Sequence, residues 1–302
     1  MSELDHLVSE AKELTSNDKI FAAHDIFDRI VEIDDSVLRD CEEFQLVTRR
    51  VQECREMLAN FEGEEWTRTQ SRHGISTFYR AEEGSNTYSF KVEGILDRSV
   101  FDLVAVLFEV DLFSEWFPFL RRATELARPA RFRKLIHMDI KLPWPLAPRD
   151  ALLDAYGVDD SKSGRVFCFL GPLAPDELEK HAPEHISLLE PSHGTVRANV
   201  KHAGVVFQLL PDGRCFFREI INVDPQLAVV PYALLNFFTG KLLYFIVANM
   251  NNTAEKCSDP ESEYSRRIKA NPEVYEYLRE VLATCKHDGD EEPEPREDSS
   301  SL

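Results

Sequence analysis

The chain has 302 residues, of which 43% are apolar, so it is long enough and apolar enough to bury a substantial core. Its formal net charge is -19 at pH 7, but the acids are concentrated at the two ends: residues 1–65 hold 18 acids and 7 bases, and residues 286–302 hold 7 acids and 2 bases. Because no sustained basic stripe accompanies this charge, we expect no nucleic-acid partner.

Residues 1–61 are predicted to form a helical hairpin or small bundle. Apolar residues recur there at helical spacing with no glycine between them, as at Leu4, Leu7, Val8, Ala11 and Leu14. Two interpretations remain open. The helices either dock on the rest of the protein or form a partner-binding module of the tetratricopeptide kind, because a single unit is too short to show a repeat period.

From Trp66 the apolar pattern changes to the period of two that is typical of strands, in hairpins separated by short turns. A helix follows at 100–108, and Asp111 caps a second, short one. Further strands are predicted near 132–141, 149–158, 164–170, 194–209 and 214–223, and a long last helix is predicted to start at Pro231 and to run past Met250. This order predicts an α+β fold for residues 62–258, in which a curved antiparallel sheet wraps the last helix and encloses space.

The remaining residues contribute less to a core. Residues 259–285 are predicted to be a polar connector followed by a short helix that Pro272 opens. Residues 286–302 are charged and have no core-forming side chains, which predicts a disordered acidic tail.

A proline-rich corner joins two of the predicted strands. Pro143, Pro145 and Pro148 each remove a backbone donor and fix φ, so they end one strand and set the direction of the next. The corner and three further motifs resemble, in the same order, the START (steroidogenic acute regulatory protein related lipid transfer) domain family: "LFSEWFPF" at 112–119, "KLPWPLAPRD" at 141–150, "TVRANVKHAG" at 195–204 and "INVDPQLAVVP" at 221–231.

The resemblance covers roughly residues 66–255 and implies a helix-grip fold, with a hydrophobic tunnel that the C-terminal helix, here 231–256, closes as a lid. The implied function is binding of one lipid or sterol-like molecule and its transfer between membranes, without a cofactor. The family often places an arginine inside the tunnel six residues after the corner arginine, and that position is Ala155 here. The family's acid in the preceding strand is matched by Asp139.

Strand alternation supplies the other candidate ligand contacts. The face that carries Arg149 is rich in small residues, and apolar residues of the later strands share one face with single polar groups. An acid or histidine that points inward must pair with another group or bind a polar atom of the ligand. The candidate ligand-binding residues are therefore His137, Asp139, Arg149, Leu153, Ala155, Val200, His202, Phe217, Glu219 and Asn236.

A basic cluster between residues 121 and 134 is the candidate membrane contact, through Arg121, Arg122, Arg131 and Arg133. Anionic lipid headgroups attract such cations. The alternative is that the protein's own acids neutralise them, in which case the acidic tail or the N-terminal helices are the obvious source.

Other chemistry finds little support. His181 and His185 are spaced like a zinc pair, but Pro183 lies between them and no third ligand follows, so no metal site is expected. There is no GxSxG, P-loop or dinucleotide motif, so we expect no enzyme. Residues 229–250 are nearly apolar, but Lys241 at their middle argues against a membrane span. Dispersed cysteines and the absence of a signal sequence predict a cytoplasmic protein, peripheral on membranes at most.

The alternative function is an interaction or scaffold protein. Its helical N-terminus would bind a protein partner, and its START-like domain would act as a lipid sensor.

Overall fold

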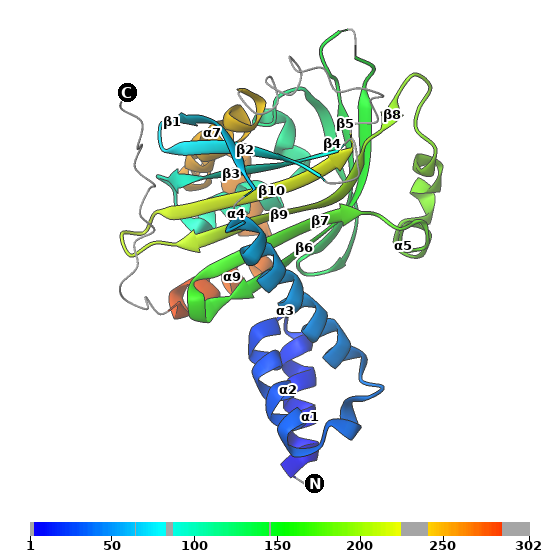
Figure 1. Cartoon of the computed structure of the whole chain (residues 1–302), viewed down its shortest axis with the longest axis vertical. Coiled ribbons are helices and arrows are strands. Elements are labelled where there is room, and N and C mark those ends of the chain that lie inside the picture. The colour runs from blue at the N-terminus through cyan, green and yellow to red at the C-terminus, as the bar shows by residue number, and fades with distance from the viewer. Residues whose placement is uncertain (1–2, 64, 83–86, 145, 225–240, 286–302) are drawn as a thin grey trace.

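The computed structural model describes residues 3–63, 65–82, 87–144, 146–224 and 241–285. Within these residues, ten strands form one curved sheet, and β8 joins it by a short parallel pairing to β6 (Figure 1). The other neighbours pair antiparallel in the order β1-β2-β3-β10-β9-β7-β6-β5-β4. The strands are β1 (Thr67–Arg72), β2 (Ile75–Ala81), β3 (Tyr88–Leu96), β4 (Leu120–Ala130), β5 (Arg133–Ile140), β6 (Arg149–Asp160), β7 (Arg165–Pro172), β8 (Val196–Arg197), β9 (Asn199–Leu209) and β10 (Cys215–Asp224).

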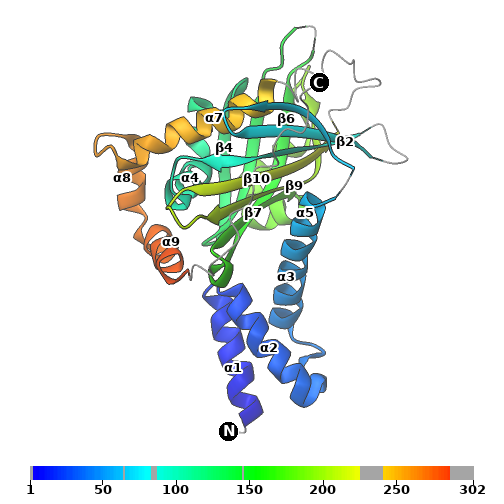
Figure 2. The same ribbon diagram turned by 60° about the vertical axis from the view of Figure 1, so that its left-hand side comes forward.

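Helices cover both faces of this sheet (Figures 1 and 2). The described helices are α1 (Glu3–Ser16), α2 (Ile20–Asp34), α3 (Glu42–Phe61), α4 (Val100–Phe108), α5 (Pro175–His181), α7 (Leu243–Thr253), α8 (Glu263–Ala270) and α9 (Pro272–Thr284). Short 3-10 turns add η1 (Asp35–Leu38), η2 (Val110–Glu115), η3 (Ser161–Ser163), η4 (Pro183–Leu189) and η6 (Ala254–Ser258). The predicted α+β helix-grip fold is confirmed.

The inner face of the sheet carries the largest apolar core. Alternate strand residues such as Val92, Val205 and Phe217 pack there against α4 and α7. α4 begins where its sequence signal predicts, because the Ser99 hydroxyl accepts a hydrogen bond from the backbone N–H of Asp102. The predicted start of the last helix at Pro231 lies outside the described residues, and its described part is α7.

The outer face is covered by the N-terminal helices, so these helices dock on the sheet. Phe27, Val51 and Phe61 belong to one core with Phe167 and Val206 of the outer face. α3 approaches β9 so closely that a Cβ on Gly204 would lie 1.8 Å from Met57 Cε. α1 and α2 then project away from the sheet (Figure 2).

Several elements differ from the sequence prediction: α5 was not predicted, and Asp111 lies inside η2 instead of capping it, because Glu109 holds the N-cap position. β4 is a strand that the sequence does not predict, because three register shifts against β5 interrupt its alternation. Residues 263–270, predicted as part of a polar connector, form α8. α8 and α9 pack beside α4, where the Tyr275 hydroxyl donates a 2.5 Å hydrogen bond to Glu109 and Arg267 forms a 3.2 Å ion pair with the same carboxylate.

Candidate functional site

A cavity of about 240 Å³ lies between the inner face of the sheet and α7, and we call it the main cavity. Strands β3, β5, β6, β7, β9 and β10 form its walls, together with η2, residues 116–119 and α7. Most of the lining side chains are apolar, for example Met138, Leu153, Val205, Phe217 and Val247. Such a surface removes apolar ligand atoms from water and offers them few polar contacts.

Arg149 is one of two charged side chains among the described residues that line the main cavity. It opens β6 directly after the proline corner and is 5% exposed. Its guanidinium donates to the carbonyl oxygens of Ala147 (2.7 Å) and Pro148 (3.3 Å). Burial lowers the pKa of Arg149 from its ordinary value. The corner therefore holds a cation at the cavity wall and supplies acceptors for it.

Glu219 is the other charged lining residue. It lies in the middle of β10, between Val92 of β3 and Val205 of β9, and its side chain faces the cavity. Burial raises the pKa of Glu219 to about 7. No hydrogen-bond or ion-pair partner of this carboxyl is found within the described part of the chain. The carboxyl is therefore available to a polar atom inside the cavity, as a donor when protonated and an acceptor when ionised.

α7 forms one wall of the main cavity through Leu243, Ile246, Val247 and Met250. Within the described part of the chain, two side-chain hydrogen bonds attach it to its surroundings. The Tyr244 hydroxyl lies 2.8 Å from Nδ1 of His73 in the β1–β2 turn, and the Asn249 amide donates a 3.0 Å bond to the carbonyl oxygen of Trp116.

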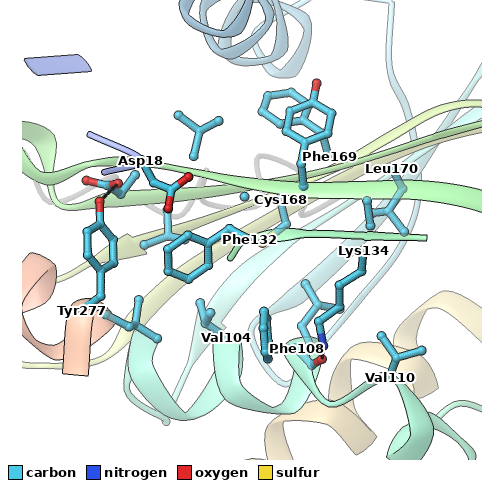
Figure 3. Close-up of a pocket in the computed structure, with 18 of the residues that line it drawn as sticks. Asp18, Val104, Phe108, Val110, Phe132, Lys134, Cys168, Phe169, Leu170 and Tyr277 are labelled. Atoms are coloured by element: carbon cyan, nitrogen blue, oxygen red, sulfur yellow. Dashed lines mark hydrogen bonds between the residues drawn. The ribbon is translucent and has the colours of Figure 1, made fainter. Parts of the chain in front are cut away.

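A second, smaller cavity of about 100 Å³ lies behind the main cavity, and we call it the rear chamber (Figure 3). Leu107, Phe113 and Leu170 line both spaces. The far end of the rear chamber carries Asp159, whose pKa burial raises to about 6 and which accepts a 2.9 Å hydrogen bond from the Tyr277 hydroxyl. The structure thus contains two adjacent apolar spaces.

The structure divides the predicted ligand-binding residues between several places. Arg149, Leu153, Val200, Phe217 and Glu219 line the main cavity together. Ala155 shares their face but lines the rear chamber. Asn236 lies outside the described residues.

His137 and Asp139 do not line either cavity. In the antiparallel register of β5 and β6 they oppose Leu152 and Asp150, which belong to the outer face, while Ile136 and Met138 face inward. The carboxylate of Asp139 pairs with Arg121 at 3.2 Å. Nε2 of His137 lies 3.5 Å from the carboxylate of Asp150, which accepts two 2.9 Å hydrogen bonds from Arg197. Arg197 and Asp150 thus attach β8 to the sheet, His137 lies beside this pair, and Asp139 links β5 to β4.

His202 also lies on the outer face, because a β-bulge interrupts β9. Asn222 pairs with His202 but the next residue, Val223, pairs with Val200, so Lys201 is an extra residue. The alternation that predicts Val200 and His202 on one face is therefore broken between them. His202 instead lies in the cleft between α3 and the sheet.

The arginines predicted to contact a membrane are largely paired. Arg121 binds Asp139, and Arg131 lies 3.6 Å from Asp18 and 3.4 Å from Glu273. Arg133 binds Asp154 at 2.6 Å and also Glu177, and these hydrogen bonds raise its pKa. Arg122 is exposed without an ion pair to any described residue. The alternative interpretation of this cluster, neutralisation by the protein's own acids, describes most of it.

Several residues that line the main cavity are not among the predicted ligand-binding residues. Met138 and Ile140 line the main cavity and alternate along β5 with His137 and Asp139 of the outer face, so the period of two in this strand would have indicated them. Trp116 belongs to the motif at 112–119, but it lines the cavity because it directly follows η2, and the sequence pattern does not show this position. No group of His, Cys, Asp or Glu side chains in the described ranges has the arrangement of a metal site, and no helix in them is long and apolar enough to cross a bilayer.

Comparison of the sequence with models of known families and with curated proteins found no match. Solved structures do match its fold. Human STARD10 has a TM-score of 0.59 at 19% identity, covering 76% of this chain and 87% of that one. Human StAR-related lipid transfer protein 5 has a TM-score of 0.58 at 15% identity, covering 70% and 99%. The human StarD13 (DLC2) lipid transfer and protein localization domain has a TM-score of 0.51 at 14% identity, covering 67% and 94%. The curved sheet, α7 against its inner face and these matches together give the chain the fold of a START domain.

Proposed function

We propose that this protein binds one lipid in the main cavity and transfers it between membranes. The observation that carries the proposal is the apolar space between the inner face of the sheet and α7, lined by Arg149 and Glu219 as its charged groups. Two of the similar structures are named as lipid transfer proteins or domains, which supports the same function here. Binding would bury apolar surface of the lipid, and each Å² removed from water would stabilise the complex by about 25 cal/mol. No covalent bond needs to form or break.

α7 is proposed to act as the lid. Its apolar side chains line the cavity, and the hydrogen bonds of Tyr244 to His73 and of Asn249 to Trp116 would break during opening, each at a cost of about 1 kcal/mol.

Membrane contact is proposed to occur at the rim beside α7 instead of at the arginine cluster. Trp144, in the proline corner, is 92% exposed, and Phe119 and Phe245 are 39% and 45% exposed. Phe119 lines the main cavity, as does Leu142 two residues before Trp144. Tryptophan favours the membrane–water interface, so the rigid corner would hold an anchor next to the cavity. Arg122 stays available for anionic headgroups.

A fluorescence assay of lipid transfer between donor and acceptor vesicles tests the function, with native mass spectrometry of the purified protein to detect bound lipid. Ala151 lines the main cavity and is 3% exposed, so Ala151→Phe should fill the space and slow transfer. Near-ultraviolet circular dichroism checks that the variant is folded. Transfer by a folded Ala151→Phe protein at the wild-type rate, or wild-type protein without bound lipid, would contradict the proposal.

A second candidate function, binding of a protein partner, is favoured by exposed apolar residues at the end of α2 and in η1. Val31, Ile33 and Val37 are 43%, 58% and 43% exposed. Deleting residues 1–61 would not test it cleanly, because α1–α3 cover apolar residues of the sheet. Ile33→Asp is the sharper variant, because it should abolish association with any protein that co-purifies while lipid transfer continues. If the same protein still co-purifies with the Ile33→Asp variant, this surface is not the binding site.

A further inference from the structure

We propose that the rear chamber is a second ligand subsite, which takes the distal end of a straight hydrocarbon chain whose polar end lies in the main cavity. The inference rests on the proposed lipid binding and makes it more specific. It predicts a ligand with at least one long, unbranched chain, and it assigns the limit on chain length to particular side chains.

Among the described residues, every side chain that lines both spaces is apolar. Leu107 of α4, Phe113 of η2 and Leu170 of β7 line both of them, so each of these side chains has one side on the main cavity and the other on the rear chamber. Side chains of this kind change rotamer without breaking a hydrogen bond. A single methylene chain is the slimmest shape that a lipid offers, and it is therefore the shape suited to pass between them.

The polar groups of the rear chamber already have partners, which leaves an apolar surface for the ligand. Tyr277 donates to Asp159, and Asp18 pairs with Arg131. The Lys134 ammonium lies 2.7 Å from the Glu125 carboxylate and donates a 2.6 Å bond to the carbonyl oxygen of Phe108. A hydrocarbon chain that enters this space leaves water and meets mainly apolar side chains. This environment suits hydrocarbon and is poor for a headgroup.

The far wall of the rear chamber comes from segments outside the sheet and α7. Asp18 lies in the turn between α1 and α2, where its φ is 64°, and Tyr277, Leu278 and Val281 belong to α9 (Figure 3). These segments lie at opposite ends of the chain, yet both close the same space. We infer that the N-terminal helices and α9 together set the longest chain that the protein accepts.

Two substitutions change the chamber in opposite directions. Ala155 on β6 lines the rear chamber and not the main cavity, so Ala155→Phe should fill it. Val281→Ala shortens a buried side chain of the α9 wall and should extend it. Ala151→Phe is the matched control, because Ala151 lies four residues earlier on the same face of β6 but lines the main cavity.

The probe is a homologous series of straight-chain 1-alkanols, whose affinity is measured by displacement of a fluorescent apolar dye from full-length, delipidated protein. For the wild type, each methylene that enters an apolar site should increase affinity about fourfold, up to the length at which the rear chamber is full. Ala155→Phe should end this increase several carbons earlier without weakening short alkanols. Val281→Ala should end it later, and Ala151→Phe should weaken alkanols of every length.

The outcomes separate this inference from the proposed function. If the wild type binds alkanols but neither Ala155→Phe nor Val281→Ala moves the length at which affinity stops rising, the rear chamber is not a subsite, although lipid binding stands. If the wild type binds no alkanol and carries no lipid, both proposals fail. If Ala155→Phe does not fold, the Val281→Ala result alone decides, because a longer limit supports the subsite and an unchanged limit rejects it.

Discussion

The buried carboxyl of Glu219 should make the protein lose stability as the pH rises through the neutral range. Burial raises its pKa from an ordinary 4.5 to about 7, so the folded protein holds a proton that the unfolded chain has released. Between those two pH values the native state binds more protons, and the free energy of unfolding therefore falls with increasing pH. A shift of this size corresponds to at most about 3 kcal/mol. The loss begins near pH 4.5 and is complete somewhat above pH 7.

Replacing the group by an uncharged one of the same shape isolates this contribution. Glu219→Gln should unfold like the wild type at pH 4.5 and should be more stable by up to about 3 kcal/mol at pH 8, measured by urea denaturation of delipidated protein. Glu276 is an exposed acid on α9, so Glu276→Gln serves as the control and should show little difference at either pH. The reasoning is refuted if the difference between Glu219→Gln and the wild type is the same at both pH values, because the carboxyl would then not titrate abnormally.

Three further variants test the fold, the lid and the membrane contact. A Cβ on Gly94 would lie 2.4 Å from a backbone oxygen, so Gly94→Ala should lower the free energy of unfolding by about 1–3 kcal/mol. Gly171 has open space around it, so Gly171→Ala should change the free energy of unfolding by less than about 0.5 kcal/mol. Equal effects of the two substitutions would contradict the packing at Gly94. Tyr244→Phe removes a lid hydrogen bond worth about 1 kcal/mol, so amide exchange in α7 should speed up about fivefold, and an unchanged rate would show that this bond does not hold the lid. Trp144→Ala should weaken binding to phosphatidylcholine vesicles about tenfold, and unaltered binding would remove the corner from the proposed contact.

The fold could be predicted from the sequence wherever alternation and turn residues agree. Cys215, Phe217 and Glu219 occupy one face of β10 as their spacing requires, because the paired part of that strand up to Asn222 keeps its register with both neighbours. His202 could not be placed in this way. The amino-acid sequence of the strand does not reveal that Lys201 is an extra residue, yet this bulge turns every following side chain of β9 to the other face.

The cavities were harder to predict than the strands because their walls depend on tertiary contacts. Leu152 and Leu153 are both buried, one under α5 and one at the main cavity, and sequence alone does not separate two covered faces of a sheet. The rear chamber needs α9 and the turn at Asp18, which local patterns do not bring together. The sequence therefore indicates that a cavity exists, but it does not identify the side chains that form the cavity's end wall.

One paired arginine, Arg131, explains how those distant segments meet at one place. Arg131 lies within 3.6 Å of Asp18 and 3.4 Å of Glu273, and its guanidinium lies 4.9 Å from the ring centre of Tyr277. It thus contacts the α1–α2 turn and α9, which both close the rear chamber. Each such ion pair contributes at most about 1 kcal/mol at a partly exposed position. The pairs therefore orient the α1–α2 turn and α9 relative to the sheet more than they stabilise the fold. Arg131, between β4 and β5, thus joins an acid of the α1–α2 turn and an acid of α9, and this charge complementarity helps to place the two segments that line the far end of the rear chamber.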